Sequence, residues 1–123
     1  MVGHVTLPAV DPGHAASHSR PVIEGVLRGQ LGHHGLVITD DLNMGAVYGL
    51  GIGRVAAEAL AAGVDLVLVS YDPDQIYRAV HGAAQALARG DIDKATLAAS
   101  RRRLAAFTGR LPTAVMQSSI IAP

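Results

Sequence analysis

Two adjacent carboxylates, Asp40 and Asp41, are the side chains whose types and position best suit chemistry. They follow directly on a short apolar run, Leu36 to Ile38, which is rich in β-branched residues and preceded by Gly35. Such a run is typical of a strand buried on both faces of a parallel sheet. In α/β proteins the reactive groups lie at the carboxyl ends of these strands. The acid pair is therefore a candidate catalytic site, where a carboxylate can act as a nucleophile or move a proton.

Two further side chains could join this site. His4 lies on a predicted first strand, and by strand alternation it could face the same mouth and contact a substrate; the alternative is a hydrogen-bonded histidine of the core or rim. Met44 follows the acids closely and could line a binding pocket, although a gap-filling core residue is equally consistent. His14 and His18 have helical i, i+4 spacing, but they lie in a Pro/Gly-flanked loop without an HExxH pattern. No metal site is therefore predicted.

The composition limits the possible partners and chemistry. The chain has 123 residues, enough for one domain, and 50% of them are hydrophobic. Ten basic residues balance ten acidic ones, so neither a nucleic acid nor an anionic membrane surface is predicted as a partner. Cysteine is absent, which excludes disulfides, thiolate nucleophiles and cysteine-ligated zinc.

No targeting or membrane segment is predicted. The N-terminus lacks a basic segment followed by an apolar run and a cleavage site, so no signal peptide is expected. No apolar run approaches the roughly 18 residues that can span a bilayer. The localisation stays open, and is cytoplasmic if Met1 is the native start. Because the first predicted strand begins at Met1 itself, we expect the native protein to have residues before it.

Strands and helices alternate along the predicted chain, which favours an α/β class with parallel strands and right-handed crossovers. A helix cap is expected at Asp72 and at Asp93, and Gly90 is placed to end the helix between them. That helix should carry an apolar stripe inward: Ile76, Ala79, Val80, Ala83, Ala84 and Leu87. The expected strands cover residues 1–7, 35–39 and 64–70, the helices 21–31, 51–62, 72–90 and 93–107, and the loops 8–19 and 45–51.

Several motifs, in the right order and spacing, resemble glycoside hydrolase family 3, and most closely its β-N-acetylhexosaminidase branch. The motifs are VLRGQLG at 26–32, GLVITDDLNMGA at 35–46, and an AL-AG-DLVLV pattern at 59–69. The resemblance extends over residues 1–110. It implies the C-terminal portion, about three β/α units, of a (β/α)8 TIM-type barrel, since a whole barrel needs roughly 250 residues. The expected domains are a partial catalytic barrel at 1–110 and a flexible tail at 111–123.

The resemblance also implies an activity. In the family the first carboxylate of the strand-end pair is the nucleophile of a retaining glycosidase, so Asp40 would form a glycosyl-enzyme ester with a terminal β-linked N-acetylhexosamine. The substrate would be a carbohydrate, and no cofactor is required. Alternation along a strand turns Asp40 and Asp41 opposite ways, so they cannot form the facing pair about 5–5.5 Å apart that retention uses. The supporting role expected for Asp41 is to hold the turn or a neighbouring amide.

The sequence departs from the family at the general acid/base. The family's KHFPGHG-like motif is absent, and without it a contribution of roughly 10²–10⁴-fold would be lost. The chain is therefore expected to be a fragment that lacks this group. The competing hypothesis is a non-catalytic half-barrel module that needs a partner chain or self-associates through the open strand edges at 1–7 and 64–70.

A third hypothesis, a response-regulator receiver, rests on the faint likeness of residues 38–44 to a phosphoacceptor strand. A receiver needs an acid pair at the end of its first strand and a lysine at the end of its last. Here the first predicted strand ends in Thr6-Leu7-Pro8, and the one lysine, Lys94, lies in the terminal helix. Both departures argue against a receiver.

Overall fold

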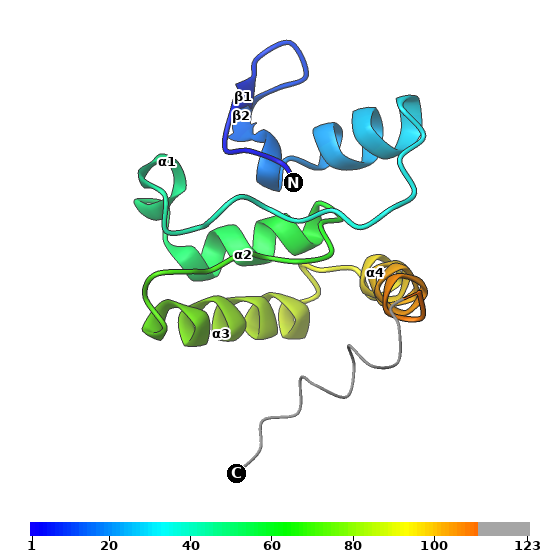
Figure 1. The fold of residues 1–123 in the computed structure, drawn as a ribbon. Coiled ribbons are helices and arrows are strands. Elements are labelled where there is room, and N and C mark those ends of the chain that lie inside the picture. Colours follow the sequence, from blue (N-terminus) through cyan, green and yellow to red (C-terminus); the bar gives the residue numbers. More distant parts are fainter. Residues whose placement is uncertain (111–123) are drawn as a thin grey trace.

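The computed structural model describes residues 1–110 (Figure 1). The expected flexible tail at 111–123 lies outside the described residues. The elements, in chain order, are β1 (Thr6–Leu7), β2 (Asp11–Ala15), η1 (Ala16–His18), η2 (Pro21–Gln30), α1 (Gly45–Tyr48), α2 (Ile52–Ala61), α3 (Asp74–Arg89) and α4 (Lys94–Thr108). Within this part of the chain, no helix is both long and apolar enough to cross a bilayer.

Three extended segments lie side by side and run parallel. Residues 37–42 form the middle one, because Val2 pairs with Thr39 on one side and Leu66 pairs with Ile38 on the other. The Val2 amide donates to the Ile38 carbonyl at 2.8 Å, and the Thr39 amide donates to the Leu66 carbonyl at 3.1 Å. The segment that carries the acid pair is therefore flanked by a parallel neighbour on each side.

Continuous strands over 35–39 and 64–70 are not formed; the segments meet through isolated bridges. The cause is that side-chain oxygens replace some of the backbone carbonyls that accept hydrogen bonds in a regular ladder. The Val37 amide donates to Asp65 Oδ2 at 2.8 Å, and the Leu68 amide donates to Thr39 Oγ1 at 3.0 Å. Each such bond satisfies an amide but interrupts the backbone pairing on which a strand depends.

The expectation of a loop over 8–19 is wrong at residues 11–15. This stretch forms β2, antiparallel to β1, with an irregular register that pairs Leu7 with Asp11 and Thr6 with Ala15. Asp11 stabilises the hairpin, because its carboxylate accepts hydrogen bonds from the Gly13 amide and the Ser19 hydroxyl. The expected first strand is correspondingly shorter, since within 1–7 only Thr6–Leu7 is regular.

The helices are close to those expected, with three corrections. The helix expected to begin at a cap on Asp72 begins at Asp74, where Pro73 is the N-cap residue and makes no side-chain capping hydrogen bond. Residues 45–51 were expected to be a loop, but they contain the short helix α1. Residues 21–30 form a π-helix, in which the Leu31 amide donates five residues back to the Val26 carbonyl. Asp93 caps α4 through the Ala95 amide, and Gly90 ends α3 in the left-handed conformation, φ +83°, as glycine allows.

Helices α2 and α3 lie side by side with their backbones in contact (Figure 1). Two glycines make this possible: a Cβ at Gly53 would lie 2.8 Å from the Arg78 carbonyl oxygen, and one at Gly82 would meet the Gly53 backbone. The buried core on one side of this pair joins α1, α2, α3 and the middle segment. Its members are Leu42, Val47, Ile52, Val55, Ala56 and Ala79.

The apolar stripe expected to face inward on α3 is only partly buried. Ala79 is buried, but Ile76 and Val80 are 47% and 62% exposed, and Leu87 is exposed as well. The contact with α2 uses the Gly82 side of α3 instead, because only there can the two backbones approach closely. The sequence pattern identified the helix but not the face that it buries.

Candidate active site

Asp40 lies near the carboxyl end of the middle extended segment. Its amide donates to the Val2 carbonyl at 2.9 Å, which fixes the backbone at the carboxyl end of two parallel segments. The side chain is half-buried. Its Oδ1 accepts the Asp41 amide at 2.9 Å, and its Oδ2 has no hydrogen-bond partner within residues 1–110. One carboxylate oxygen is thus oriented by the backbone, and the other accepts no hydrogen bond from this part of the chain.

Both carboxylate oxygens of Asp41 accept hydrogen bonds from the protein. Oδ1 accepts the Asn43 amide at 3.0 Å and the Ser70 amide at 3.1 Å, while Oδ2 accepts the Ser70 hydroxyl. Burial acts to raise the pKa of Asp41, but the hydrogen bonds from Ser70 and Asn43 outweigh it and hold the pKa below its usual value. This carboxylate stays ionised and joins the middle segment to the third one.

His4 is engaged by the protein through both ring nitrogens. Nε2 lies 2.9 Å from the Asp41 carbonyl oxygen and must donate to it, so Nδ1 of the neutral ring accepts from Ser17 Oγ at 2.6 Å. Ser17 is fully buried and also lies 3.4 Å from Nδ1 of the buried His18. This placement favours the alternative of a hydrogen-bonded rim histidine, and substrate contact by His4 stays a prediction.

Met44 lies on the turn that follows the acids. Its amide donates to the Asp41 carbonyl at 3.0 Å, and its side chain is 46% exposed. The predicted site residues are therefore brought together, because the Asp41 carbonyl accepts from both His4 and Met44. Beside them is a cavity of about 450 Å³ that is lined by Asn43, Tyr48, Tyr71 and Asp72.

Ser70 and Ser17 belong to this site although sequence reasoning passed over them. A signal for Ser70 existed: it ends the third predicted strand, and the carboxyl ends of parallel strands meet at one edge of a sheet. No comparable signal existed for Ser17, since its contact with His4 depends on how the hairpin β1–β2 folds back. His14 and His18 meet edge to face, with ring centroids 5.8 Å apart. Within residues 1–110, no group of three or more His, Cys, Asp or Glu side chains is placed to hold a metal ion.

Comparison with known families places this geometry in context. Residues 1–107 match the model described as the glycosyl hydrolase family 3 N terminal domain. The chain belongs to glycosyl hydrolase family 3. The family resemblance drawn from the motifs is thereby confirmed. The match extends over nearly all of the described residues, so the hairpin, the acid pair and the four longer helices are all parts of one family 3 domain.

Curated and structural relatives agree with this family. A "Beta-hexosaminidase" of Xanthomonas campestris pv. campestris (strain B100) is 43% identical over 86 residues, covering 68% of this chain and 25% of the relative. One of Bordetella avium (strain 197N) is 47% identical over 75 residues, covering 60% of this chain and 21% of the relative. The chain spans about a fifth to a quarter of the length of these curated relatives.

The fold is similar to solved family 3 structures. A glycoside hydrolase family 3 β-N-acetylglucosaminidase from Paenibacillus sp. str. FPU-7 superposes with a TM-score of 0.80 and 40% identity, covering 84% of this chain and 20% of that one. The β-N-acetylhexosaminidase from Beutenbergia cavernae DSM 12333 gives a TM-score of 0.70 and 39% identity over 80% of this chain and 30% of that one. These likenesses confirm the barrel-type α/β fold at a coarse level.

Proposed function

We propose that this chain supplies the nucleophile-bearing part of a β-N-acetylhexosaminidase that cleaves terminal β-linked N-acetylhexosamine with retention. The single observation that carries the proposal is that the two acids differ in their hydrogen bonding. Asp41 is hydrogen-bonded on both oxygens, whereas Asp40 keeps one oxygen unpartnered among residues 1–110. The names and fold of the relatives support the substrate class.

In the proposed reaction, Asp40 Oδ2 attacks the anomeric carbon and forms an ester bond as the glycosidic oxygen leaves. That oxygen needs a proton, and water later cleaves the ester with the configuration retained. The sequence lacks the KHFPGHG-like segment associated with the proton donor. We therefore propose that the chain acts as about three β/α units of a barrel, completed by other residues that carry the acid/base. His4 and Met44 are the proposed neighbours of the bound sugar.

A glycosyl fluoride tests the nucleophile without the missing acid, because fluoride leaves with little need of a proton. A 5-fluoro-N-acetylhexosaminyl fluoride should leave a covalent sugar on the full chain, and tandem mass spectrometry should place it on Asp40. Asp40→Asn should abolish labelling, and in a barrel completed by the residues that carry the acid/base, hydrolysis of a chromogenic β-N-acetylglucosaminide should fall by roughly 10³-fold or more.

The matched control is Asp74→Asn, which removes an exposed acid at the start of α3 and should label like the parent chain. Sugar found on Asp41 would reverse the assignment of the two acids. No adduct on a barrel completed by the residues that carry the acid/base would contradict the nucleophile role of Asp40.

The second candidate function is a non-catalytic half-barrel module that binds a partner chain or a second copy of itself. The observation that favours it is the exposed apolar surface on α3, together with the exposed Leu66 on the third segment. A binding module of this kind would associate with its partner whether or not sugar is present, and it would form no sugar adduct on Asp40. The absence of an adduct separates this candidate from the first.

A further inference from the structure

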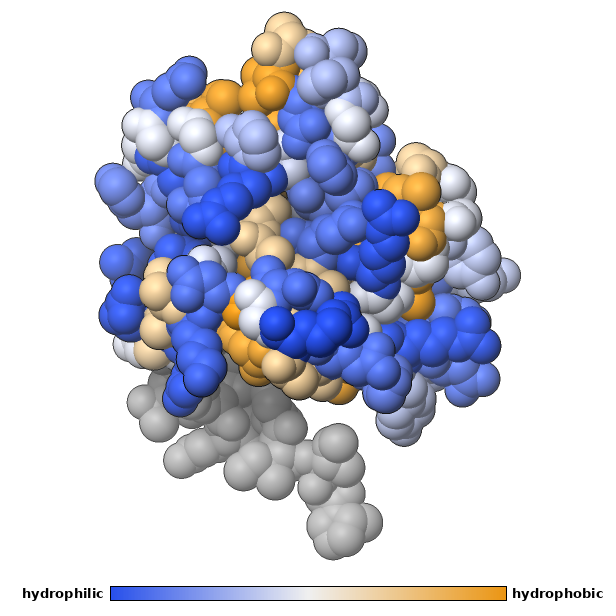
Figure 2. Space-filling view, turned by 180° about the vertical axis from the view of Figure 1, so that it is seen from behind, coloured by the Kyte–Doolittle hydropathy of each residue, from blue (hydrophilic) through white to orange (hydrophobic). Residues whose placement is uncertain are grey.

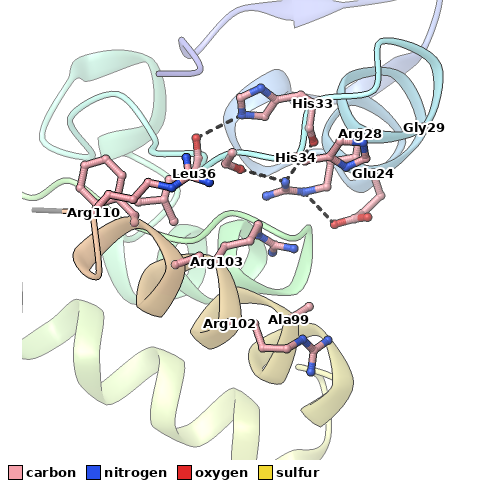
Figure 3. Close-up of a pocket in the computed structure, with 13 residues that line it drawn as sticks. Glu24, Arg28, Gly29, His33, His34, Leu36, Ala99, Arg102, Arg103 and Arg110 are labelled. Carbon is pink, nitrogen blue, oxygen red and sulfur yellow. Dashed lines mark hydrogen bonds and ion pairs between the residues drawn. The ribbon is translucent and has the colours of Figure 1, made fainter.

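A second cavity lies away from the acid pair, between η2 and α4 (Figure 3). Its volume is about 580 Å³, and its lining includes four arginines: Arg28, Arg102, Arg103 and Arg110. Gly35 and Leu36, at the start of the middle segment, form part of the wall. Asp40 lies five residues further along, which at about 3.3 Å a residue places the cavity roughly 16 Å from the acid pair.

Two of the arginines are fixed by the protein. The Arg28 side chain is 10% exposed and donates to the carbonyls of Gly35 and Gly63 and to Asp65 Oδ2. Arg103 donates from Nε to Asp65 Oδ1 at 2.9 Å. Figure 3 shows Arg28 reaching from η2 and Arg103 from α4 toward the space between the two helices. These two side chains form a rigid wall, and Asp65 and Glu24 balance their charges.

The other two arginines carry uncompensated charge. Within residues 1–110, neither Arg102 nor Arg110 forms an ion pair with a carboxylate. Two positive charges therefore remain at the cavity after Asp65 and Glu24 are counted. Arg28 Nε is buried and lies 3.4 Å from Glu24 Oε1, so this nitrogen belongs to the balanced part of the lining. His33 and His34 also line the cavity.

We propose that this cavity binds a small dianion of the phosphate-monoester class. Arginine guanidinium groups donate paired hydrogen bonds that match phosphate oxygens, and two unbalanced charges match a dianion. Phe107, Ala106 and Leu36 provide an apolar surface beside the arginines, on which the organic group of the ester can lie. The site is separate from the acid pair and does not depend on the proposed glycosidase reaction.

Inorganic phosphate is the first probe, measured by isothermal titration calorimetry on the full chain at constant ionic strength with chloride as the other anion. Binding should saturate at one site, and Arg102→Gln or Arg110→Gln should each weaken it by about tenfold or more. The matched control is Arg101→Gln, since Arg101 is exposed on the same helix and does not line the cavity. Its affinity should equal that of the parent chain.

Three results would overturn the proposal. They are no saturable binding up to about 10 mM phosphate, equal weakening by the Arg101 and Arg102 substitutions, and equal affinity for chloride. Circular dichroism of each variant shows whether the fold is retained; both substituted arginines are exposed, so their replacement should not affect folding. A phenyl phosphate probe should bind more tightly than inorganic phosphate if the ester's organic group lies on the apolar surface.

Discussion

Asp65 joins three parts of the chain that are distant in sequence. Its side chain is fully buried, and it accepts hydrogen bonds from Arg28, Arg103 and the Val37 amide. A buried carboxylate is costly unless it is paired in this way. Its predicted structural role at the start of the third segment is consistent with these contacts, which lie at the opposite end of the parallel segments from Asp40.

Replacing Asp65 with Asn should lower the free energy of unfolding by about 3–5 kcal/mol, because the largely buried guanidinium groups of Arg28 and Arg103 would lose their shared counter-charge. Urea unfolding followed by circular dichroism measures this change. Asp91→Asn is the matched control: Asp91 forms an exposed pair with Arg89, and such pairs contribute about 0–1 kcal/mol. Equal losses in the two variants would show that Asp65 contributes no more than a surface ion pair.

Asp65 should also make the stability of the folded protein depend on pH, in a direction that follows from its lowered pKa. Burial acts to raise the pKa of Asp65, but the hydrogen bonds from Arg103, Val37 and Ser100 overcome it and lower the pKa below its usual value. A carboxylate with a lowered folded-state pKa stabilises the protein above its unfolded pKa of about 3.9, and this contribution is lost as the pH falls. Asp65→Asn should therefore reduce the acid sensitivity of unfolding below about pH 4.

His18 should also destabilise the protein on acidification, in a higher pH range than Asp65. Burial is the main cause that lowers its pKa; Glu58 opposes the shift, while His14, His4 and Arg54 add to it. A histidine whose pKa is lowered on folding stabilises the protein above its unfolded value of about 6.5, and this stability is lost as the pH falls below that value. Thermal melting should therefore shift downward between pH 7 and 5.5.

His18→Gln should flatten this dependence, whereas His34→Gln, which changes an exposed histidine, should leave it unchanged. Differential scanning fluorimetry across that pH range compares the three chains. An unaltered slope in the His18 variant would contradict the role of burial.

At the scale of elements, local chemistry predicted the helices well and the sheet poorly. Asp93 and Gly90 act on neighbouring backbone groups, so helix ends could be derived from sequence. The regular strands were misjudged, because side chains of Asp65 and Thr39, distant in sequence from the amides they bind, replace backbone pairs. The acid pair was located because it follows an apolar run, whereas Ser17 could be placed only by the fold.

The contact between α2 and α3 yields a prediction that opposes the usual effect of alanine. Alanine is generally favoured over glycine in a helix by up to about 1 kcal/mol. At Gly82, however, a Cβ would collide with the Gly53 backbone, so Gly82→Ala should destabilise the protein by about 1–3 kcal/mol. Gly25→Ala is the control, because a Cβ there meets nothing within 4 Å. Chemical denaturation should show a lower free energy of unfolding for Gly82→Ala than for Gly25→Ala. Equal values would mean that α2 and α3 can move apart without cost.

At the scale of the molecule, apolar side chains remain on the surface. Figure 2 shows them in separate patches among polar residues on the face in view. On α3 they include Val80, and Leu66 lies on the third segment, which has one parallel neighbour in the described part of the chain. Unpaired edges and apolar faces favour association with another chain.

This surface predicts that the chain self-associates in a concentration-dependent way. Val80→Lys and Leu66→Lys should each shift sedimentation-velocity profiles toward the monomer, because a charge in an apolar contact is costly. Lys is a suitable replacement, since both positions are already exposed. The control is Ala98→Lys on α4, an exposed site away from both surfaces. A parent chain that stays monomeric at about 100 μM would contradict self-association.

The contacts of Asp65 also bear on the order of events during folding. Its two arginine partners lie 37 residues before it and 38 residues after it, so both contacts require long loops to close. When a contact forms after the rate-limiting step of folding, its loss accelerates unfolding rather than slowing folding. We therefore predict that Asp65 makes its contacts late, after the helices and the α2–α3 pair have formed, and that Asp65→Asn accelerates unfolding more than it slows refolding in stopped-flow measurements.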